Sequence, residues 1–293
     1  MQKINPMLWF DDKAEEAANF YVSLFGNSNV STVTRYGEAG PGAPGSVMTV
    51  TFELAGQDFV ALNAGPHFKF NPSISLYVAC ETAEEIDALW AKLSEGGSVL
   101  MELGKYPFSE KFGWCADRFG LTWQLNLASF PQKISPCLMY VQEQSGRAEE
   151  AMKFYTSLFK DSSIDRVERY AAGEPGVEGT VKHGVFSLEG QKFIAMDGGK
   201  DHAFTFNEAI SLVVNCETQA EVDEFWEKLS EGGEKSQCGW VKDKFGLSWQ
   251  ITPTILARLY ADNDPEKSKR VMQAMLQMTK LDIAALKRAY EGS

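Results

Sequence analysis

The sequence is poor in the residue types that most often build reactive or metal-binding sites. Its 293 residues include three histidines, and its five cysteines form no CxxC pair and no cluster with metal-ligand spacing. Three scattered histidines give no Ser-His-Asp or Cys-His arrangement. The first residues also lack a basic region followed by an apolar stretch. An odd number of cysteines without an export signal predicts reduced thiols and a cytoplasmic location.

Long apolar runs and an excess of positive charge are missing as well. No stretch approaches the roughly 18 apolar residues that a membrane-spanning helix needs. The formal net charge is −12, so no basic face is expected that would neutralise nucleic acid or an anionic membrane. With 44% apolar and 23% charged residues, the composition is that of an ordinary globular protein. We therefore expect neither nucleic acid nor a membrane as a partner.

The chain contains one long unit written twice. The stretch EEAANFYVSLFG at 15–26 returns as EEAMKFYTSLFK at 149–160, and DRFGLTWQL at 117–125 returns as DKFGLSWQI at 243–251. Repetition of this length indicates a duplicated structural unit. It predicts a first domain at 1–131, a second at 132–257 and a tail at 258–293.

Each copy reads as two similar halves, and each half as strand, helix and three strands. In the first half of copy one, Ala17, Phe20, Tyr21 and Leu24 form the apolar stripe of a packed helix. In the second half, Thr82 with Glu85 has the spacing of a capping box, as do Thr218 and Glu221 in copy two. The predicted strands of copy one are 7–10, 30–36, 47–54, 59–63, 74–79, 99–103, 113–116 and 122–126. We therefore predict an α+β fold with four βαβββ modules, in which the two modules of a copy fold into one cup.

The tail predicts two helices of its own. Asp264-Pro265 is an N-cap followed by proline at the first helical position, and Asp282 caps a second helix that ends near Tyr290. We expect its apolar residues to pack on the domains, with a dimer contact or a lid over a cavity as alternatives; they are Val271, Met275, Met278, Leu281 and Leu286.

Several stretches together resemble one protein family. They are MLWFDD at 7–12, AEEAANFYVSLFG at 14–26, RYGEAGPG at 35–42, GWCADRFGLTWQ at 113–124 and RVMQAMLQMTKLDIAALKRA at 270–289. They resemble the PhnB-like group of the vicinal oxygen chelate superfamily, whose members often carry the name 3-demethylubiquinone-9 3-methyltransferase. The superfamily also holds glyoxalase I, bleomycin-resistance proteins and extradiol dioxygenases. The resemblance covers nearly the whole chain and implies tandem glyoxalase/bleomycin-resistance-like domains, each of two βαβββ modules.

The resemblance also implies where a metal would bind, and this sequence departs from that pattern. Metal-dependent members carry one ligand on the first and one on the last strand of each module. Here the matching positions hold Asn5, Ala61, Ser73 and Gln124 in copy one, and Ser135, Ala195, Ala209 and Gln250 in copy two. A divalent metal needs imidazole, thiolate or carboxylate ligands, which none of these residues provides. We therefore predict no metal, and a glyoxalase- or dioxygenase-type reaction is the disfavoured alternative.

The distribution of glycines bears on whether the chain could be a methyltransferase that binds S-adenosylmethionine. An S-adenosylmethionine site commonly uses a glycine-rich turn between a strand and a helix. The one dense glycine run, at 37–45, is interrupted by Pro41 and Pro44 and leads into another strand, which predicts a hairpin loop. We predict no cofactor.

The alternation of side chains along strands gives candidate ligand-binding residues. If Asn5 faces the cup, then Met7 and Trp9 share its face, and we expect Ala61 and Asn63 to do the same. The predicted lining is aromatic with scattered amides and hydroxyls, which suits a small organic ligand. The ligand-binding candidates are Trp9, Asn63, Ser75, Tyr77, Trp114, Gln124, Met139, Asp197, Ser211, Trp240 and Gln250.

Three hypotheses for function follow. The first is a small-molecule-binding protein without metal, whose ligand is aromatic or hydrophobic. The second is an enzyme that acts on a quinone-like substrate, including the methyl transfer of the family name. The third is an interaction module that acts through the methionine-rich tail. Duplication predicts an internal pseudo-dimer and leaves a further homodimer open.

Overall fold

The computed structural model describes residues 2–260, 262 and 264–292; residues 1, 261, 263 and 293, which fall within the predicted domains and tail, lie outside the described part. Two mixed sheets of eight strands each organise the chain. Contacts divide it into two compact units. Unit 1 comprises Met1–Phe68 and Asn207–Ser293, and unit 2 comprises Lys69–Phe206.

Unit 1 combines the first module of copy one with the second module of copy two. Its elements from copy one are β1 (Ile4–Phe10), α1 (Ala14–Leu24), β2 (Asn29–Arg35), β3 (Val47–Leu54) and β4 (Gln57–Asn63). From copy two it takes β13 (Ile210–Cys216), α4 (Gln219–Ser230), β14 (Glu234–Lys235), β15 (Trp240–Lys242) and β16 (Ser248–Pro253). The strand order is β14-β15-β16-β13-β1-β4-β3-β2.

Unit 2 contains the remaining two modules. Copy one provides β5 (Ile74–Cys80), α2 (Ala83–Leu93), β6 (Ser98–Tyr106), β7 (Ser109–Ala116) and β8 (Thr122–Leu127). Copy two provides β9 (Ile134–Val141), the short 3-10 helix η1 (Gln142–Gln144), α3 (Ala148–Leu158), β10 (Ser163–Arg169), β11 (Val181–Leu188) and β12 (Gln191–Gly199). The strand order is β10-β11-β12-β9-β5-β8-β7-β6.

The two copies therefore exchange modules. Antiparallel pairs join β1 to β13 and β5 to β9, and each pair joins one copy to the other. The expectation that each copy folds its own two modules into one cup is wrong. Its physical cause is visible in the strands: β1 (INPMLWF) resembles β9 (ISPCLMYV), and β5 (ISLYVAC) resembles β13 (ISLVVNC). Two similar strands are two equally suitable partners, so the strand pattern does not select between them. The boundaries at 131 and 257 stay a prediction for the repeat along the chain.

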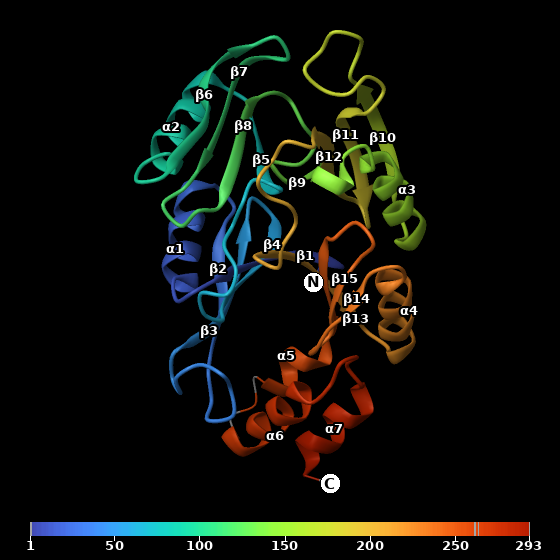
Figure 1. Ribbon diagram of the computed structural model, residues 1–293. Helices are drawn as coiled ribbons and strands as arrows, with labels where there is room; N and C mark the ends of the chain where they lie inside the picture. Colours follow the sequence, from blue (N-terminus) through green and yellow to red (C-terminus); the bar gives the residue numbers. More distant parts are fainter. Residues whose placement is uncertain (1, 261, 263, 293) are drawn as a thin grey trace. The chain divides into compact units, whose positions relative to one another are not determined.

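The helices lie on one side of each sheet. In unit 1, α1 contacts β3 and α4 contacts β16, and in unit 2, α2 contacts β8 and α3 contacts β11. Figure 1 shows all four on the outer side of their sheets. Large side chains fill the space beneath them, among them Phe52, Phe59, Trp123, Phe186, Phe193 and Trp249. The face of each sheet that carries no helix is called its inner face below.

Two helices begin as the sequence predicts. The hydroxyl of Thr82 accepts a hydrogen bond from the Glu85 amide (3.2 Å), and the Glu85 carboxylate accepts one from the Glu81 amide (2.8 Å). Thr218 accepts from the Glu221 amide in the same way (3.2 Å). These bonds satisfy N–H groups that have no partner within the helix. The two capping boxes are confirmed.

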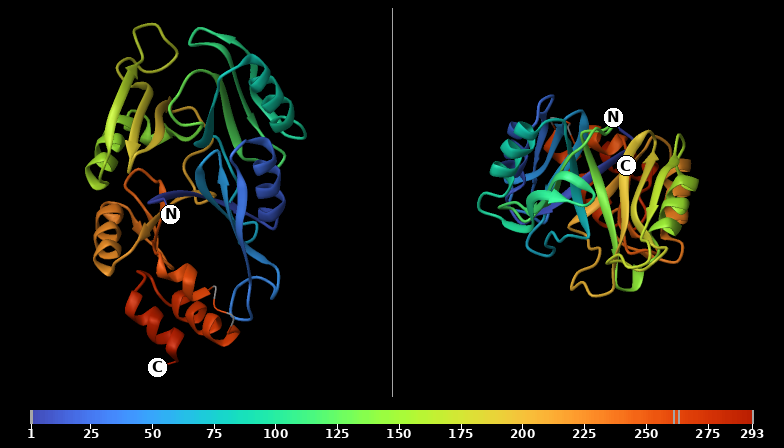
Figure 2. Two further views of the ribbon diagram at one scale, coloured as in Figure 1. Left: turned by 180° about the vertical axis from the view of Figure 1, so that it is seen from behind. Right: turned by 90° about the horizontal axis from the view of Figure 1, so that it is seen from above.

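The tail forms a small helical layer in unit 1. Its helices are α5 (Ile255–Tyr260), α6 (Pro265–Leu276) and α7 (Ile283–Glu291), and they lie together in the view from behind (Figure 2, left). The side chains of Asp264 and Asp282 cap α6 and α7, as predicted. Within the described part of the chain, no helix has both the length and the apolar character needed to cross a membrane.

Candidate functional site

The register of the strands assigns side chains to faces, because residues paired across two strands point to the same side of a sheet. In unit 1, Asn5 pairs with Val213 and Met7 pairs with Ser211. Val213 in turn pairs with Gln250. These residues therefore share the inner face. The face joins Trp9 of copy one to Ser211, Trp240 and Gln250 of copy two.

Two tryptophans and an amide form the candidate site of unit 1. The Trp9 ring meets the Trp240 ring edge-on, with 6.0 Å between centroids, and meets Phe68 at 5.0 Å. The Trp9 indole N–H donates to the Gly65 carbonyl (2.8 Å), which fixes the ring. On the same face, Gln250 Nε2 donates to the buried Ser211 hydroxyl (2.9 Å).

Unit 2 repeats this arrangement with different neighbours. Gln124 Nε2 donates to Ser75 Oγ (2.7 Å) and lies 3.5 Å from Cys137 Sγ. Trp114 pairs with Gln124 across β7 and β8, as Trp240 pairs with Gln250 in unit 1. Here too the site is shared between copies, because Cys137 belongs to copy two.

A polar chain continues along the inner face of unit 2. Asn126 Nδ2 donates to the Tyr77 hydroxyl (2.7 Å), and Ser109 Oγ donates to Asn126 Oδ1 (2.5 Å). Met139 is buried nearby and its amide donates to the Ser73 carbonyl (2.8 Å). The sequence interpretation did not single out Asn126; its pairing with Phe112 appears only in the sheet register.

Apolar side chains surround these polar groups in unit 2. Tyr77, Ala79, Cys137 and Ile194 form one buried cluster. Phe130, from the segment between the copies, packs against it and meets the Tyr77 ring edge-on at 5.7 Å. The inner face is thus an aromatic and aliphatic wall with a few hydrogen-bonding groups, which is the usual composition of a small-molecule site.

Asn63 does not join this lining. Phe10 pairs with Asn63 across β1 and β4, and Phe10 lies on the helix side, opposite to Trp9. The Asn63 amide oxygen accepts from the Ala14 amide (2.8 Å) at the start of α1, and its Nδ2 donates to the Val47 carbonyl (3.1 Å). The prediction that placed Asn63 with Asn5 on the cup face is wrong, because β4 pairs with β1 one residue out of the assumed phase. The same pairing places Ala61 beside Leu8, on the helix side.

Asp197 is the counterpart of Asn63 in copy two and is likewise turned to the helix side, where it pairs with Tyr140. One carboxylate oxygen accepts from the amides of Gly146 (2.8 Å) and Ala148 (3.2 Å), and the other accepts from the Val181 amide (2.8 Å). Burial raises the pKa of this carboxyl above its ordinary value, and the backbone donors oppose that rise. Its prediction as a cup residue is also wrong, since it holds the start of α3.

The donor set does not fit the metal of the superfamily's metal-dependent members. In unit 1 the inner face presents Asn5 and Gln250, and in unit 2 it presents Gln124 and Ser135. Neutral amides and hydroxyls are weak ligands for a divalent transition metal. Throughout the described residues, no group of three His, Cys, Asp or Glu side chains has the geometry of a metal site.

The four buried cysteines offer no nucleophile. Cys80, Cys115, Cys137 and Cys216 are buried, and burial raises the pKa of each thiol to about 12. A thiol with such a pKa stays protonated at neutral pH and reacts poorly. Cys80 and Cys216 lie at equivalent strand ends of the two copies and are small buried thiols.

The glycine- and proline-rich loop is a hairpin between β2 and β3, as predicted. Its backbone wraps the ring of Tyr36, and a Cβ atom at Gly42 would lie 2.3 Å from that ring. The Arg35 guanidinium donates to the Gly45 carbonyl (3.1 Å) and so closes the loop. The Tyr36 ring fills the space inside the loop that an adenosyl group would need, so the loop does not fit S-adenosylmethionine.

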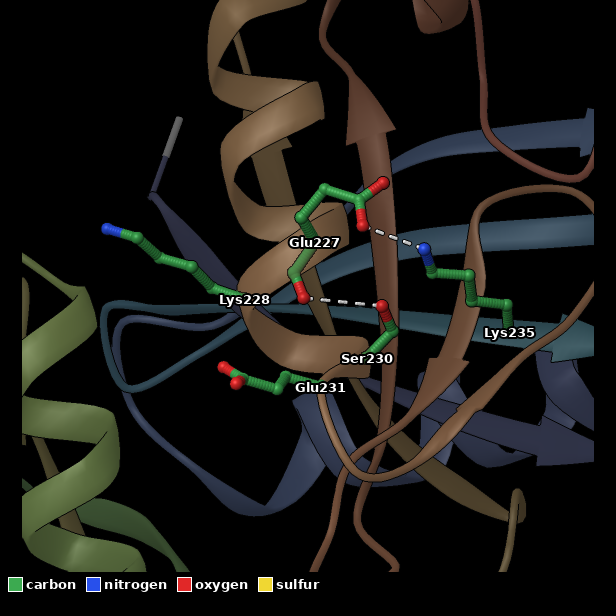
Figure 3. A pocket seen from close by; sticks show the side chains of 5 residues that line it. All are labelled: Glu227, Lys228, Ser230, Glu231 and Lys235. Atoms are coloured by element: carbon green, nitrogen blue, oxygen red, sulfur yellow. Dashed lines mark hydrogen bonds and ion pairs between the residues drawn. The ribbon is translucent and has the colours of Figure 1, made fainter.

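A shallow hollow on the outer side of unit 1 is lined by charged residues. Lys235 Nζ donates to the Glu227 carboxylate (2.8 Å), as Figure 3 shows. The Ser230 hydroxyl donates to backbone carbonyls of its own helix, and the Lys228 side chain points away from the hollow in the same view. Lys235 and Glu227 pair with each other and Lys228 pairs with Glu224 of the same helix, so we interpret this hollow as an ordinary helix surface.

Comparison with known proteins shows the family. The model of the 3-demethylubiquinone-9 3-methyltransferase family matches residues 2–126 and again 132–252. No curated protein matches the chain. Among solved structures, the chain is similar to a putative 3-demethylubiquinone-9 3-methyltransferase, a PhnB protein from Bacillus cereus, with 52% identity over 43% of this chain and 100% of that one (TM-score 0.42).

The likeness of the whole chain is to a two-domain fold. Glyoxalase I from Zea mays matches 85% of this chain and 90% of its own, with 10% identity and a TM-score of 0.55. At that identity the likeness concerns the fold alone, which is the tandem vicinal oxygen chelate architecture. Because the family model matches both copies over most of their length, the chain belongs to the 3-demethylubiquinone-9 3-methyltransferase family.

Proposed function

We propose that the inner faces of both units bind a small aromatic or hydrophobic organic molecule without a metal ion. Buried polar atoms that face this wall without a partner carry the proposal. Among the described residues, Asn5 Oδ1 and Ser248 Oγ in unit 1 and Trp114 Nε1 in unit 2 are buried and accept or donate no hydrogen bond. A buried polar atom without a partner costs about 1–3 kcal/mol. A ligand that brings one matching polar group into an otherwise apolar wall would remove this cost.

Trp114 supports the proposal because its indole N–H has no partner on any residue that the structure describes, although the neighbouring side chains of Gln124 and Ser75 are hydrogen-bonded to each other. Gln124, its cross-strand neighbour, already donates to Ser75. A ligand oxygen placed between them would accept from the indole while its ring packs on the aromatic wall. Such sites gain specificity from a few polar groups in apolar surroundings.

The test is binding of small aromatic molecules, followed by thermal stabilisation and quenching of tryptophan fluorescence. A ligand at 100 times its Kd stabilises a protein by about 2.7 kcal/mol. Trp114→Phe keeps the ring and removes the donor, so we expect weaker binding by about fivefold to tenfold. Trp90→Phe makes the same change on α2, against the opposite face of β7, and is the matched control. Equal affinity in both variants would contradict the role of Trp114.

A metal ion would overturn the proposal directly. We expect elemental analysis of the purified protein to find no stoichiometric zinc, nickel, iron or manganese. A tightly held metal would show that the inner faces recruit ligands other than Asn5, Gln124 and Gln250.

Methyl transfer is the second candidate, because the family's description names it. Titration calorimetry with S-adenosylmethionine tests it. Measurable binding would favour an enzyme on a quinone-like substrate, and the absence of heat would count against methyl transfer. We also propose a cytoplasmic location, which the five free cysteines support.

A further inference from the structure

The two inner faces differ in charge along one wall. In unit 1, Thr32 pairs with Thr51 and Thr34 pairs with Thr49. In unit 2 the same register positions pair Arg166 with Val185 and Glu168 with His183. Both sets face inward, because Thr51 is linked through Val60 to Met7, and Val185 through Ile194 to Cys137. At these positions the wall carries threonines in unit 1 and an arginine, a glutamate and a histidine in unit 2.

From this difference we infer that unit 2 takes an aromatic ligand that carries an anionic group, such as a carboxylate, and that Arg166 and His183 recognise the anion. The inference rests on the proposed function, since it assigns a ligand class to one of the two inner faces. The ring of such a ligand would lie on Tyr77, Ile194 and Phe130, and its anion would point to β10 and β11.

Arg166 has hydrogen-bonding capacity to spare. Its Nη1 lies 3.3 Å from the Glu168 carboxylate, and its Nη2 lies 3.4 Å from His183 Nδ1. A guanidinium has five N–H donors, so further donors remain for a ligand. The Glu168 pair holds the guanidinium weakly, because both side chains are more than half exposed. A ligand carboxylate can therefore displace the Glu168 carboxylate from the Arg166 guanidinium, or bind to the guanidinium beside it.

The position of Arg166 relative to the aromatic cluster supports a shared ligand. Arg166 pairs with Val185, and Val185 pairs with Ile194, which belongs to the buried cluster of Tyr77. The guanidinium and the aromatic cluster therefore lie on the same face of one sheet, with one strand between β10 and the strand of Ile194. Burial, reinforced by Arg166, lowers the pKa of His183, so its ring is neutral at pH 7. Its Nδ1 faces Arg166, which leaves the proton on Nε2 as a second donor.

Unit 1 provides an internal comparison. Thr34 and Thr49 bond to each other through their hydroxyls (2.6 Å), so that pair is satisfied without a ligand. The threonines provide no positive counter-ion for a carboxylate, and the nearby Glu53 and Asp58 on the same face are acidic. We therefore expect unit 1 to prefer a neutral molecule.

The experiment compares 2-naphthoate with its neutral carboxamide, 2-naphthamide, on the full chain at pH 7.5 by titration calorimetry. We expect naphthoate to bind at one site per chain, about tenfold more tightly than naphthamide binds there. Arg166→Gln should weaken naphthoate about tenfold and leave naphthamide within twofold, since a charge-assisted hydrogen bond is lost. Arg166→Lys keeps the positive charge but loses the two parallel N–H donors of the guanidinium. Its affinity for naphthoate should lie between those of the unchanged protein and Arg166→Gln.

Arg169→Gln is the matched control, because it removes the same charge from the same strand. Arg169 is ion-paired with Glu149 of α3 (2.6 Å), on the helix side. If Arg166→Gln and Arg169→Gln have equal effects on naphthoate, the inference is overturned. If naphthoate and naphthamide bind equally and Arg166→Gln changes neither, the anion assignment fails while the proposed function stands. If neither molecule binds, both fail.

A gain of binding tests the comparison between units. Thr32→Arg places a guanidinium at the position in unit 1 that Arg166 has in unit 2. We expect the number of naphthoate sites per chain to rise from one to two. An unchanged number of sites would overturn the assignment of anion preference to this strand position.

Discussion

At the scale of single residues, the repeated motif that ends each copy is explained by structure. Asp117 accepts from the amides of Phe119 and Leu121, and its second oxygen accepts from the Trp123 indole (2.8 Å). Asp243 makes the equivalent bonds, with 2.9 Å to the Trp249 indole. The aspartate holds a tight turn and orients a buried tryptophan. The motif therefore stabilises the sheet, and the adjacent glutamine provides the polar group of the inner face.

This role predicts a loss of stability for Asp117→Asn. In asparagine an NH2 group replaces one of the two carboxylate oxygens. This NH2 group must face either the indole N–H or the backbone N–H groups, and all of these are donors. We expect the free energy of unfolding in urea to fall by about 2–4 kcal/mol. Trp123→Phe removes the same indole bond, so a double-mutant cycle should show coupling of about 1 kcal/mol or more. Additive effects would contradict a shared bond.

His183 predicts a pH dependence. Its folded pKa lies below the ordinary value of about 6.5, because burial and Arg166 disfavour the charged ring, against the opposing effect of Glu168. Between the two pKa values the unfolded chain binds more protons than the folded one. The free energy of unfolding therefore falls as pH drops below about 6.5, by at most about 1.4 kcal/mol per pH unit for this group. His183→Gln should flatten this part of the profile, and an equal slope in both proteins would contradict the account.

At the scale of elements, the tail has its own core and is tied to unit 1 by its backbone. Leu256, Leu259, Val271, Leu281 and Leu286 form one buried cluster. The amides of residues 238 and 239 donate to the carbonyls of Met278 and Thr279 (both 2.8 Å). The expected packing of the tail on the domains is thus only part of its structure, because most of its apolar residues pack on one another.

This core predicts the effect of Leu286→Ala. Removing a fully buried leucine costs about 2–5 kcal/mol. We expect faster hydrogen exchange at α6 and α7 and unchanged exchange in unit 2. Lys287→Ala, on the exposed side of the same helix, is the control. If deletion of 264–293 lowers the solution mass by more than the deleted segment, the tail also joins chains.

How far the sequence predicts these elements depends on whether the information is local. The capping pair of Thr82 and Glu85 acts within one turn and is readable from spacing. The face of Asn63 is not, because it depends on the register between β1 and β4. Arg166 and His183 were missed for the same reason: alternation along one strand does not show which strand lies opposite. The available signal was an arginine and a histidine in copy two at positions where copy one has threonines.

At the scale of the whole molecule, the central claim is that each sheet is shared between copies. The duplication produced two strands of each kind, and the fold pairs β5 with β9 and β1 with β13. Each candidate site therefore needs residues of both copies, as Gln124 and Cys137 show in unit 2. A single copy would present only half of each inner face.

A designed disulfide tests this claim most directly. Ser75 of copy one pairs with Cys137 of copy two, and paired residues on antiparallel strands lie about 4.5–5.5 Å apart, within the range of a disulfide. Because both positions are buried in the folded chain, the reduced and unfolded Ser75→Cys variant is refolded in a glutathione redox buffer, in which the thiols can react before they are buried. Mass spectrometry should then find one linked peptide pair that joins residue 75 to the native Cys137. The same variant with Cys137→Ser is the control. The account predicts this link in the full chain; its absence while the protein stays folded would contradict the exchange of modules.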